Sequence, residues 1–270
     1  MIFYILGGVL VAAGVGLFLG SGSQRRKVYA MKSTDTSTAA DLAGLAESVA
    51  KEIGAGSFTQ ATEVKGVVEC DAPLTGELSG RPCVHYAMSI RREWEEMVSK
   101  TDSQGRRTQD TRTGSDTVAS NTRGTRFRVK DATGAIDVDP TGAKIDGEKA
   151  VSQFRPGEPM GGTLEFGGVR INLPGFGGGG RRTVGYRYEE TILPVGAQVY
   201  VLGEASDAGG ALSVRTPSKK DARFLISVRS EEELVRKAGS AARGLSIAAA
   251  VSAAVGVALA VLAFLGIIGG

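Results

Sequence analysis

Two long uncharged segments, one near each end of the chain, constrain the fold more than any other feature of the sequence. Residues 2–19 carry no charged side chain, and residues 245–268 contain no charge, no Asn, no Gln and no Pro. A hydrocarbon core about 30 Å thick is crossed by roughly 20 apolar residues in a helix that rises about 1.5 Å per residue. We therefore predict transmembrane helices at 2–19 and 245–268, with a domain between them on one side of the bilayer.

The basic residues beside these segments predict which side that is. Arg25–Lys27 follow the first segment, and Arg236, Lys237 and Arg243 precede the second. Lys and Arg close to the end of a span favour the cytoplasmic side. Both groups lie on the domain side, so we expect a two-span integral membrane protein with a cytoplasmic middle domain. The first segment does not resemble a signal peptide, because no basic residue precedes it.

Small residues recur at helical spacing in both predicted spans. Such residues let helices approach closely. The spans are therefore expected either to pack together or to join copies of the chain into a homo-oligomer. The alternative is an Ala- and Gly-rich anchor that makes no specific contact with another helix. The residues are Gly16, Gly20, Ala249, Ser252, Ala253, Gly256 and Ala260.

Residues 21–58 are expected to hold a juxtamembrane linker and an amphipathic helix. Asp35 and Ser37 are candidate N-caps, and Gly54 would end the helix. Apolar residues recur within it at the spacing i, i+3, i+7 and i+11, which places them on one face. These are Leu42, Leu45, Val49 and Ile53. Such a face packs against the domain or lies on the bilayer surface.

From about residue 60 the apolar period changes to two, which indicates strands. Residues 64–70 and 83–91 alternate in this way, and residues 127–138 have the pattern of a hairpin with Gly134 in its turn. The chain has 39 Gly and only 6% aromatic residues, which favours a β domain with many turns over a helical bundle. We predict an all-β domain with minor helices over residues 60–240, either an OB-like small barrel or a sandwich. The barrel is preferred because closure removes strand edges.

Residues 99–123 contain almost no apolar side chain and are expected to form a mobile polar loop. Four arginines in it, Arg106, Arg107, Arg112 and Arg123, are interleaved with aspartates. A solvated loop explains this pattern as well as a contact for an acidic partner does.

The residues do not predict catalysis, a cofactor or a metal site. The run Gly177–Gly180 lacks the Gly-Lys-Ser/Thr of a phosphate loop, and His85, the single histidine, is more simply structural. Two Cys and one His are too few for a structural zinc site. Cys70 and Cys83 are expected to be reduced, with a disulfide as the alternative. The net charge of +3 is too small to indicate nucleic-acid binding.

Several segments, taken in order, resemble one family. They are residues 63–68, 74–86, 127–134, 138–140, 189–197 and 201–204. Together they resemble the GIDE or BAM (beside-a-membrane) domain of membrane-anchored E3 ubiquitin ligases in mitochondria and chloroplasts and of prokaryotic relatives. The resemblance also covers the two flanking spans. It marks twelve positions with a structural or partner-binding role: Gly80, Arg81, Pro82, Cys83, Tyr86, Asp131, Gly134, Pro140, Pro194, Gly196, Gly203 and Glu204.

The sequence departs from the eukaryotic ligases in one important respect. Those ligases carry a RING finger after the second span, and the RING recruits the ubiquitin-conjugating enzyme. These 270 residues lack the Cys and His ligands for a RING. The resemblance therefore implies a prokaryotic-type relative without its own ligase chemistry. In the mitochondrial ligase the domain faces the intermembrane space, whereas the charge rule here predicts the cytoplasm.

The expected function is a membrane-anchored, non-catalytic interaction or sensing module with the bilayer and an unidentified protein as partners. One alternative is a subunit of an E3 ligase-like or protease-associated complex whose catalytic part lies on another chain. Another is direct sensing of lipid or envelope stress, for which the amphipathic helix is the only support.

Overall fold

The computed structural model describes residues 2–32, 34–101, 105–157, 163–172, 180–220, 222–265 and 267. The chain divides into two units. Residues 1–36, 221–223 and 229–270 form a helical unit, and residues 37–220 and 224–228 form a β unit.

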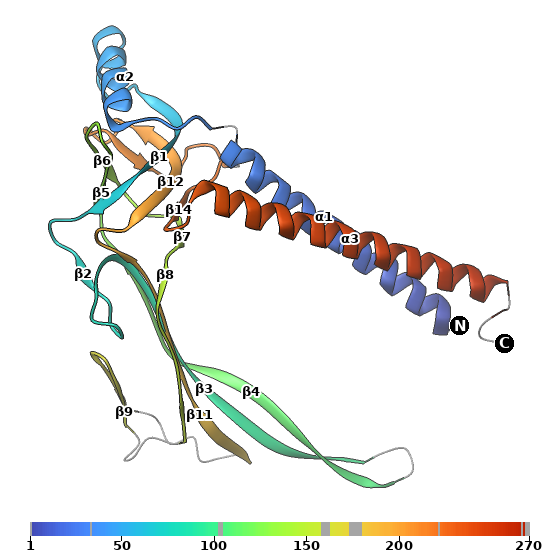
Figure 1. Cartoon of the computed structure of the whole chain (residues 1–270). Helices are drawn as coiled ribbons and strands as arrows, with labels where there is room; N and C mark the ends of the chain where they lie inside the picture. Colours follow the sequence, from blue (N-terminus) through green and yellow to red (C-terminus); the bar gives the residue numbers. More distant parts are fainter. Residues whose placement is uncertain are drawn as a thin grey trace. The chain divides into compact units, whose positions relative to one another are not determined.

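The helical unit consists of α1 (Ile2–Lys32) and α3 (Glu231–Phe264), which run antiparallel along each other (Figure 1). Both helices are long and apolar enough to cross a membrane, by length and composition. They are longer than the predicted spans. The expected linker after residue 20 begins as a continuation of α1, and the short helix expected at residues 231–237 is the first part of α3.

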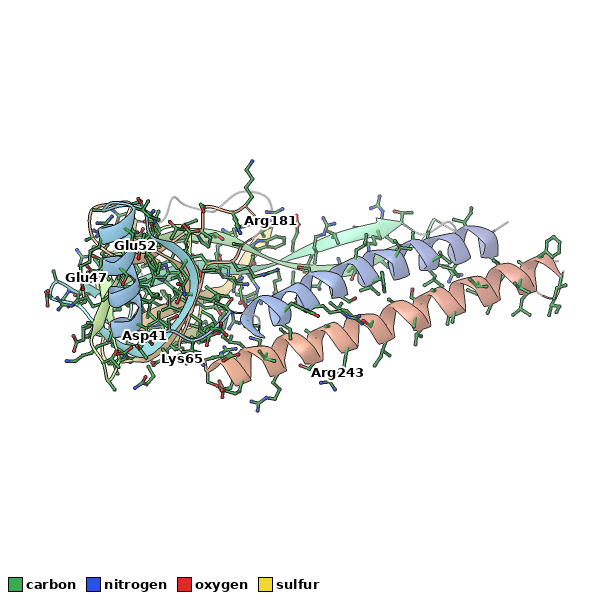
Figure 2. The ribbon with its side chains drawn as sticks, turned by 90° about the horizontal axis from the view of Figure 1, so that it is seen from above. Asp41, Glu47, Glu52, Lys65, Arg181 and Arg243 are labelled. Atoms are coloured by element: carbon green, nitrogen blue, oxygen red, sulfur yellow. The ribbon has the colours of Figure 1, made fainter. Side chains whose placement is uncertain are left out.

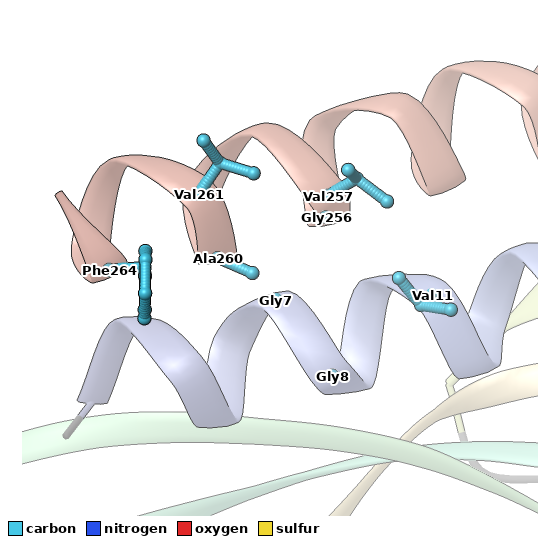
Figure 3. A pocket seen from close by; sticks show the side chains of 8 residues that line it. All are labelled: Gly7, Gly8, Val11, Gly256, Val257, Ala260, Val261 and Phe264. Atoms are coloured by element: carbon cyan, nitrogen blue, oxygen red, sulfur yellow. The ribbon is translucent and has the colours of Figure 1, made fainter.

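Glycines let the two backbones touch. A Cβ atom on Gly7 would lie 2.8 Å from the carbonyl oxygen of Gly256, and one on Gly14 would lie 3.0 Å from that of Ala249. The Ser252 hydroxyl donates a 2.8 Å hydrogen bond to the Leu10 carbonyl. Figure 3 shows Gly7 facing Gly256 and Ala260 across this seam. The spans therefore pack against each other within one chain.

The small residues predicted on the second span lie at this seam, whereas the close backbone approaches on the first span are at Gly7 and Gly14 and not at Gly16 or Gly20. A Cβ on Gly16 would have no neighbour within 4 Å, and the nearest atom to one on Gly20 is a Leu245 methyl at 3.9 Å. Gly7 and Gly14 take their place because a spacing of seven residues keeps to one side of a helix.

Helix α2 (Ala39–Glu52) lies against the barrel through part of the predicted face, since Leu42 and Val49 pack in the core. Leu42 and the small residues Ala39 and Ala46 are buried, whereas Leu45 and Ile53 are 45% and 73% exposed. The N-cap is Thr38, which forms a capping box with Asp41, and not Asp35 or Ser37. Figure 2 shows three acidic side chains of α2: Asp41, Glu47 and Glu52.

Five strands close into a barrel in the order β1-β5-β6-β13-β12 and back to β1. The β6–β13 pairing is parallel and the other four are antiparallel. The strands are β1 (Thr59–Glu69), β5 (Phe127–Lys130), β6 (Ala135–Val138), β12 (Gln198–Ser206) and β13 (Ser213–Arg215). Their inward side chains form the main core with α2; among them are Val64, Val129, Val138, Val201 and Val214. The OB-like barrel is confirmed. The short strands β7 (Lys144–Asp146) and β14 (Leu225–Ser227) extend its sheet beside β12.

A second, antiparallel sheet is built from two excursions of the chain out of the barrel. One lies between β1 and β5 and the other between β6 and β12. Its strands are β2 (Leu74–Thr75), β3 (Pro82–Thr101), β4 (Arg107–Gly124), β8 (Glu148–Pro156) and β11 (Arg181–Pro194). The hairpin of β9 (Thr163–Phe166) and β10 (Val169–Asn172) packs on one face, where the rings of Phe166 and Tyr188 stack 4.4 Å apart.

The prediction of an irregular loop over residues 99–123 is wrong for the residues described there. Residues 99–101 belong to β3 and residues 107–123 to β4, and the two strands pair from His85–Gly124 to Thr101–Arg107. Polar strands show no apolar alternation, so this hairpin gave no periodic signal in the sequence.

Candidate interaction surface

A buried carboxylate organises the turn between β2 and β3. Glu190 on β11 is fully buried, and its oxygens accept hydrogen bonds from the backbone nitrogens of Leu78 and Ser79, each 2.9 Å long. A Cβ on Gly76 would lie 2.8 Å from Glu190 Oε2, so a side chain there would displace the buried carboxylate. Gly80 closes the turn with φ of +67°, a conformation that favours glycine.

A second carboxylate beside this turn, that of Glu77, accepts hydrogen bonds from two side chains. The Tyr86 hydroxyl donates a 2.7 Å hydrogen bond to Glu77 Oε1, and the Asn121 amide donates to the same oxygen. Burial, and then the hydrogen bond to Glu77, raises the pKa of Tyr86, so the phenol stays a donor at neutral pH. This network ties the turn to β3 and β4.

Arg81 connects the same turn to the far strand of the sheet. Its guanidinium donates to Glu148 on β8 at 2.6 Å, and both side chains are about half exposed. The hydrogen bond from Arg81 holds the pKa of Glu148 below its usual value. An exposed pair of this kind is screened by water, so it positions the turn more than it stabilises the fold.

Both cysteines are free thiols. Cys83 is fully buried opposite Leu74 and Pro194, and burial, reinforced by the charge of Glu190, raises the pKa of its thiol. Cys70 is partly buried, with its Sγ 3.7 Å from the Arg126 carbonyl oxygen. His85 is also partly buried, and burial lowers its pKa. These groups lie in a packed sheet and form no nucleophile–base pair among the described residues.

The twelve motif positions fall into separate groups. Gly80 and Arg81 lie in the turn before β3, and Pro82, Cys83 and Tyr86 lie on β3. Cys83 pairs with Pro194 on β11, Pro82 accepts from the Val195 nitrogen at 3.4 Å, and Gly196 has φ of +82°. The remaining five lie elsewhere in the β unit and have structural roles. Asp131 and Gly134 form the β5–β6 turn, Pro140 begins the next turn, Gly203 lets Phe224 and Val214 approach β12, and Glu204 accepts from the Ser218 backbone and hydroxyl.

Sequence reasoning missed Glu77, Asn121, Glu148 and Glu190 as partners of the motif residues. The only available signal was strand alternation, which predicts that Glu189 and Glu190 point to opposite faces. That prediction is confirmed, since Glu190 is fully buried and Glu189 pairs with Arg91 on the solvent side.

The solvent-facing side of the second sheet carries opposite charges across neighbouring strands. Arg187 on β11 donates to Glu93 on β3 at 2.6 Å, and Arg182 donates to Glu95. Opposite charges on facing strands support the pairing of those strands. Because these charges neutralise one another, this face offers little net field to a partner.

The far end of β3 and β4 forms a two-stranded arm that extends past the rest of the sheet (Figure 1). The β11 pairing ends at Arg181–Glu96, so Met97–Thr101 pair only with Arg107–Thr111. We call these paired residues the arm. Met97 in the arm is 70% exposed. Within the described chain, the outer edge of β4 pairs with no strand.

Comparison with known proteins identifies the family of the chain. A family model named GIDE, described as E3 Ubiquitin ligase, matches residues 95–262. The chain belongs to the GIDE family. The match begins near the far end of β3, runs through the arm, through β4, β8 and β11 of the second sheet and through four of the five barrel strands, and ends in α3; β1 and β2 lie before it. No curated protein and no solved structure matches the chain.

The zinc chemistry of a RING finger is not encoded in these residues of the GIDE protein. RING zinc ions are each held by four Cys or His ligands, whereas this sequence has two Cys and one His. Within the described ranges, no three His, Cys, Asp or Glu side chains come together as a metal site.

Proposed function

We propose that this GIDE-family chain is a membrane-anchored, non-catalytic interaction module. Helices α1 and α3 hold the β unit at the bilayer, on the cytoplasmic side, and the β unit binds a protein partner there. The length and apolarity of both helices support the anchoring, and the basic residues on the domain side of each support the orientation. Tethering raises the effective concentration of the β unit for partners at the same membrane.

The free edge of β4 is the observation that carries the proposal. A strand at the edge of a sheet offers a row of unpaired backbone N–H and C=O groups to another extended segment. β4 is 18 residues long and contains no proline or lysine, two residues that commonly protect such edges. We expect the partner to add a strand along this edge.

The charges along β4 indicate the chemistry of the partner segment. Asp110 is paired with Lys100 at 2.6 Å, and Asp116 with Arg92 at 3.2 Å. Arg107 and Arg112 are exposed and form no ion pair with described residues. Because the acids are neutralised and these arginines are not, an acidic extended segment fits the edge best.

Shortening the arm tests this function without disturbing the rest of the sheet. Residues 97–111 are replaced by Asn-Gly, a favourable two-residue hairpin turn, so that Glu96 and Arg112 remain paired. The β11–β3 register is retained, because its last pair is Arg181–Glu96. Loss of the proteins cross-linked at the membrane, with unchanged stability and membrane retention, is the expected result. An unchanged set of cross-linked proteins would show that the partner does not bind at the arm.

A charge variant separates the edge from general electrostatics. Arg107→Glu with Arg112→Glu should weaken partner binding at least about tenfold. The matched control is Arg126→Glu with Arg128→Glu on the barrel, where each arginine forms a surface ion pair. Equal loss of binding in both variants would show that the free edge is not the contact.

The family description supports a second candidate function, in which this chain is a subunit of an E3 ligase-like complex whose catalytic part lies on another chain. The same cross-linking experiment separates the two functions. Recovery of a ubiquitin-like conjugating or ligating protein through the arm would favour the subunit, and recovery of a protein without such chemistry would favour the interaction module.

A further inference from the structure

The charged residue that borders the uncharged segment of each helix is an arginine. α1 carries no charge over residues 2–24 and then reaches Arg25, and α3 carries none over residues 244–264, directly after Arg243. At about 1.5 Å per residue these uncharged lengths are about 35 Å and about 32 Å, close to the thickness of a hydrocarbon core. Because the helices are antiparallel, both arginines lie at the same end of the uncharged region.

Packing between the helices holds one of these arginines at the start of the apolar region. Arg25 Nη2 donates a 3.2 Å hydrogen bond to the Ser246 hydroxyl of α3, which in turn donates to the Ala242 carbonyl at 2.9 Å. Ser246 lies just inside the uncharged part of α3. The Arg25 guanidinium therefore lies at the boundary between charged and apolar sequence, the level that lipid phosphates occupy in an anchored helix.

No protein carboxylate neutralises this end of the helical unit. Among the described residues, neither Arg25 nor Arg243 has an ion-pair partner, and both side chains are exposed. Figure 2 shows Arg243 projecting from α3. The acidic residues on α3, at 231–233, are ten or more residues away, which is about 15 Å along the helix. That distance exceeds the screening length of about 8 Å at physiological salt.

We infer that Arg25 and Arg243, with Ser246 orienting Arg25, form a site for the phosphate of an anionic phospholipid. A guanidinium presents its donors as a fork that matches phosphate oxygens. Two unneutralised cations favour a headgroup that remains negative and disfavour a zwitterionic one, whose own cation would be repelled. This site rests on the proposed membrane anchoring and specifies which lipid the anchor selects.

The test uses the full-length protein in a neutral detergent, with phosphatidylglycerol or phosphatidylcholine added and the retained lipid counted by native mass spectrometry. The wild-type protein should retain at least about tenfold more phosphatidylglycerol than phosphatidylcholine. Arg25→Gln with Arg243→Gln should remove this preference. Arg236→Gln with Lys237→Gln, which removes the same charge from exposed positions nearer the start of α3, should keep it.

Three results would overturn the site: no preference in the wild-type protein, equal loss in the control variant, or displacement of the lipid by excess inorganic phosphate. The last would identify a site for free phosphate and not for a lipid. Alkaline extraction of cell membranes keeps this inference separate from the anchoring on which it rests. Protein released by alkali contradicts the anchoring, whereas protein that resists alkali but shows no lipid preference contradicts the site alone.

Discussion

The carboxylate of Asp131, in the β5–β6 turn, accepts a 2.7 Å hydrogen bond from the backbone nitrogen of Ala39, the first residue of α2. The neighbouring Thr133 hydroxyl accepts from the Ala40 nitrogen at 3.1 Å. The first backbone donors of a helix have no partner within it. The barrel thus caps α2 from outside, in addition to the cap by Thr38. This explains why a turn residue of the barrel is among the motif positions.

Asp131→Ala should destabilise the protein by about 1–2 kcal/mol, because it removes an acceptor for several backbone donors. Burial raises the pKa of Asp131, but hydrogen bonds from Thr133, Ala39 and Gly134 outweigh it and hold the pKa below its usual value. The stabilising contribution is therefore present at neutral pH and lost as pH falls through the lowered pKa. Denaturant unfolding of the β unit at neutral and acidic pH measures it.

Asp131→Asn is the matched variant, since it keeps an acceptor oxygen and removes the charge. It should retain part of the stability and lose the acid dependence that Asp131 contributes. If Asp131→Ala and the wild-type protein unfold at the same denaturant concentration, the external cap contributes nothing.

Glu190 and Glu189 are adjacent on β11 but should respond very differently to truncation. Glu190→Ala leaves the buried Leu78 and Ser79 nitrogens without an acceptor and should cost about 2–4 kcal/mol. Glu189→Ala breaks only surface pairs with Arg91 and Lys149 and should cost less than about 1 kcal/mol. Urea unfolding of both variants gives the comparison. Equal losses of unfolding free energy would refute the role of the Glu190 carboxylate in holding the turn.

Gly7 and Gly8 provide a matched pair in α1. A side chain at Gly7 would collide with the Gly256 carbonyl, whereas one at Gly8 would meet nothing within 4 Å. Gly7→Leu should separate the helices and cost about 1–3 kcal/mol, while Gly8→Leu should leave them packed. A disulfide between cysteines placed at Leu10 and Ser252 reports the packing, because the Ser252 hydroxyl contacts the Leu10 carbonyl. Equal disulfide yields in both leucine variants would contradict the close packing of α1 against α3 at Gly7.

How well the sequence predicts a structural feature of this protein depends on how far apart in the chain the interacting residues lie. Apolar alternation on β1 and β3 is a local signal, and both strands and the barrel were predicted from it. The capped helix α2 was also predicted, and its buried face was predicted in part: Leu42 and Val49 pack in the core, but Leu45 and Ile53 do not. Ala39 and Ala46 contact the barrel because their small side chains allow close approach, and Leu45 is left exposed. Which face of a helix is buried depends on the surface it meets, and that surface is distant in sequence.

The groups that contact the motif residues could not be predicted either, because they are also distant in sequence. Glu190 meets Leu78 and Ser79 across more than a hundred residues, and strand alternation fixes only the direction in which its side chain points. β4 forms a strand because β3 pairs with it, although its own sequence is polar on both faces. The sequence therefore does not reveal the distant partners of Glu190, nor a strand such as β4 whose sequence carries no apolar alternation.

Cys83 should resist alkylation in the folded protein although Cys70 reacts. Burial raises the pKa of the Cys83 thiol, so the reactive thiolate is scarce at neutral pH, and its side chain is inaccessible. Maleimide labelling followed by peptide mass spectrometry distinguishes the two thiols, and denatured protein serves as the control in which both react. Rapid labelling of Cys83 in the native protein would show that the base of β3 opens in solution.

The side of the membrane that the β unit occupies is the prediction with the widest consequence. In a Cys70→Ser, Cys83→Ala background, the single cysteine of Gln109→Cys lies on the exposed arm. If the basic flanks set the orientation, a membrane-impermeant maleimide should label it only after the membrane is opened. Labelling in sealed cells would place the arm outside, as in the mitochondrial ligases. The charge rule would then fail for this chain, and the acidic partner segment would have to come from the compartment outside.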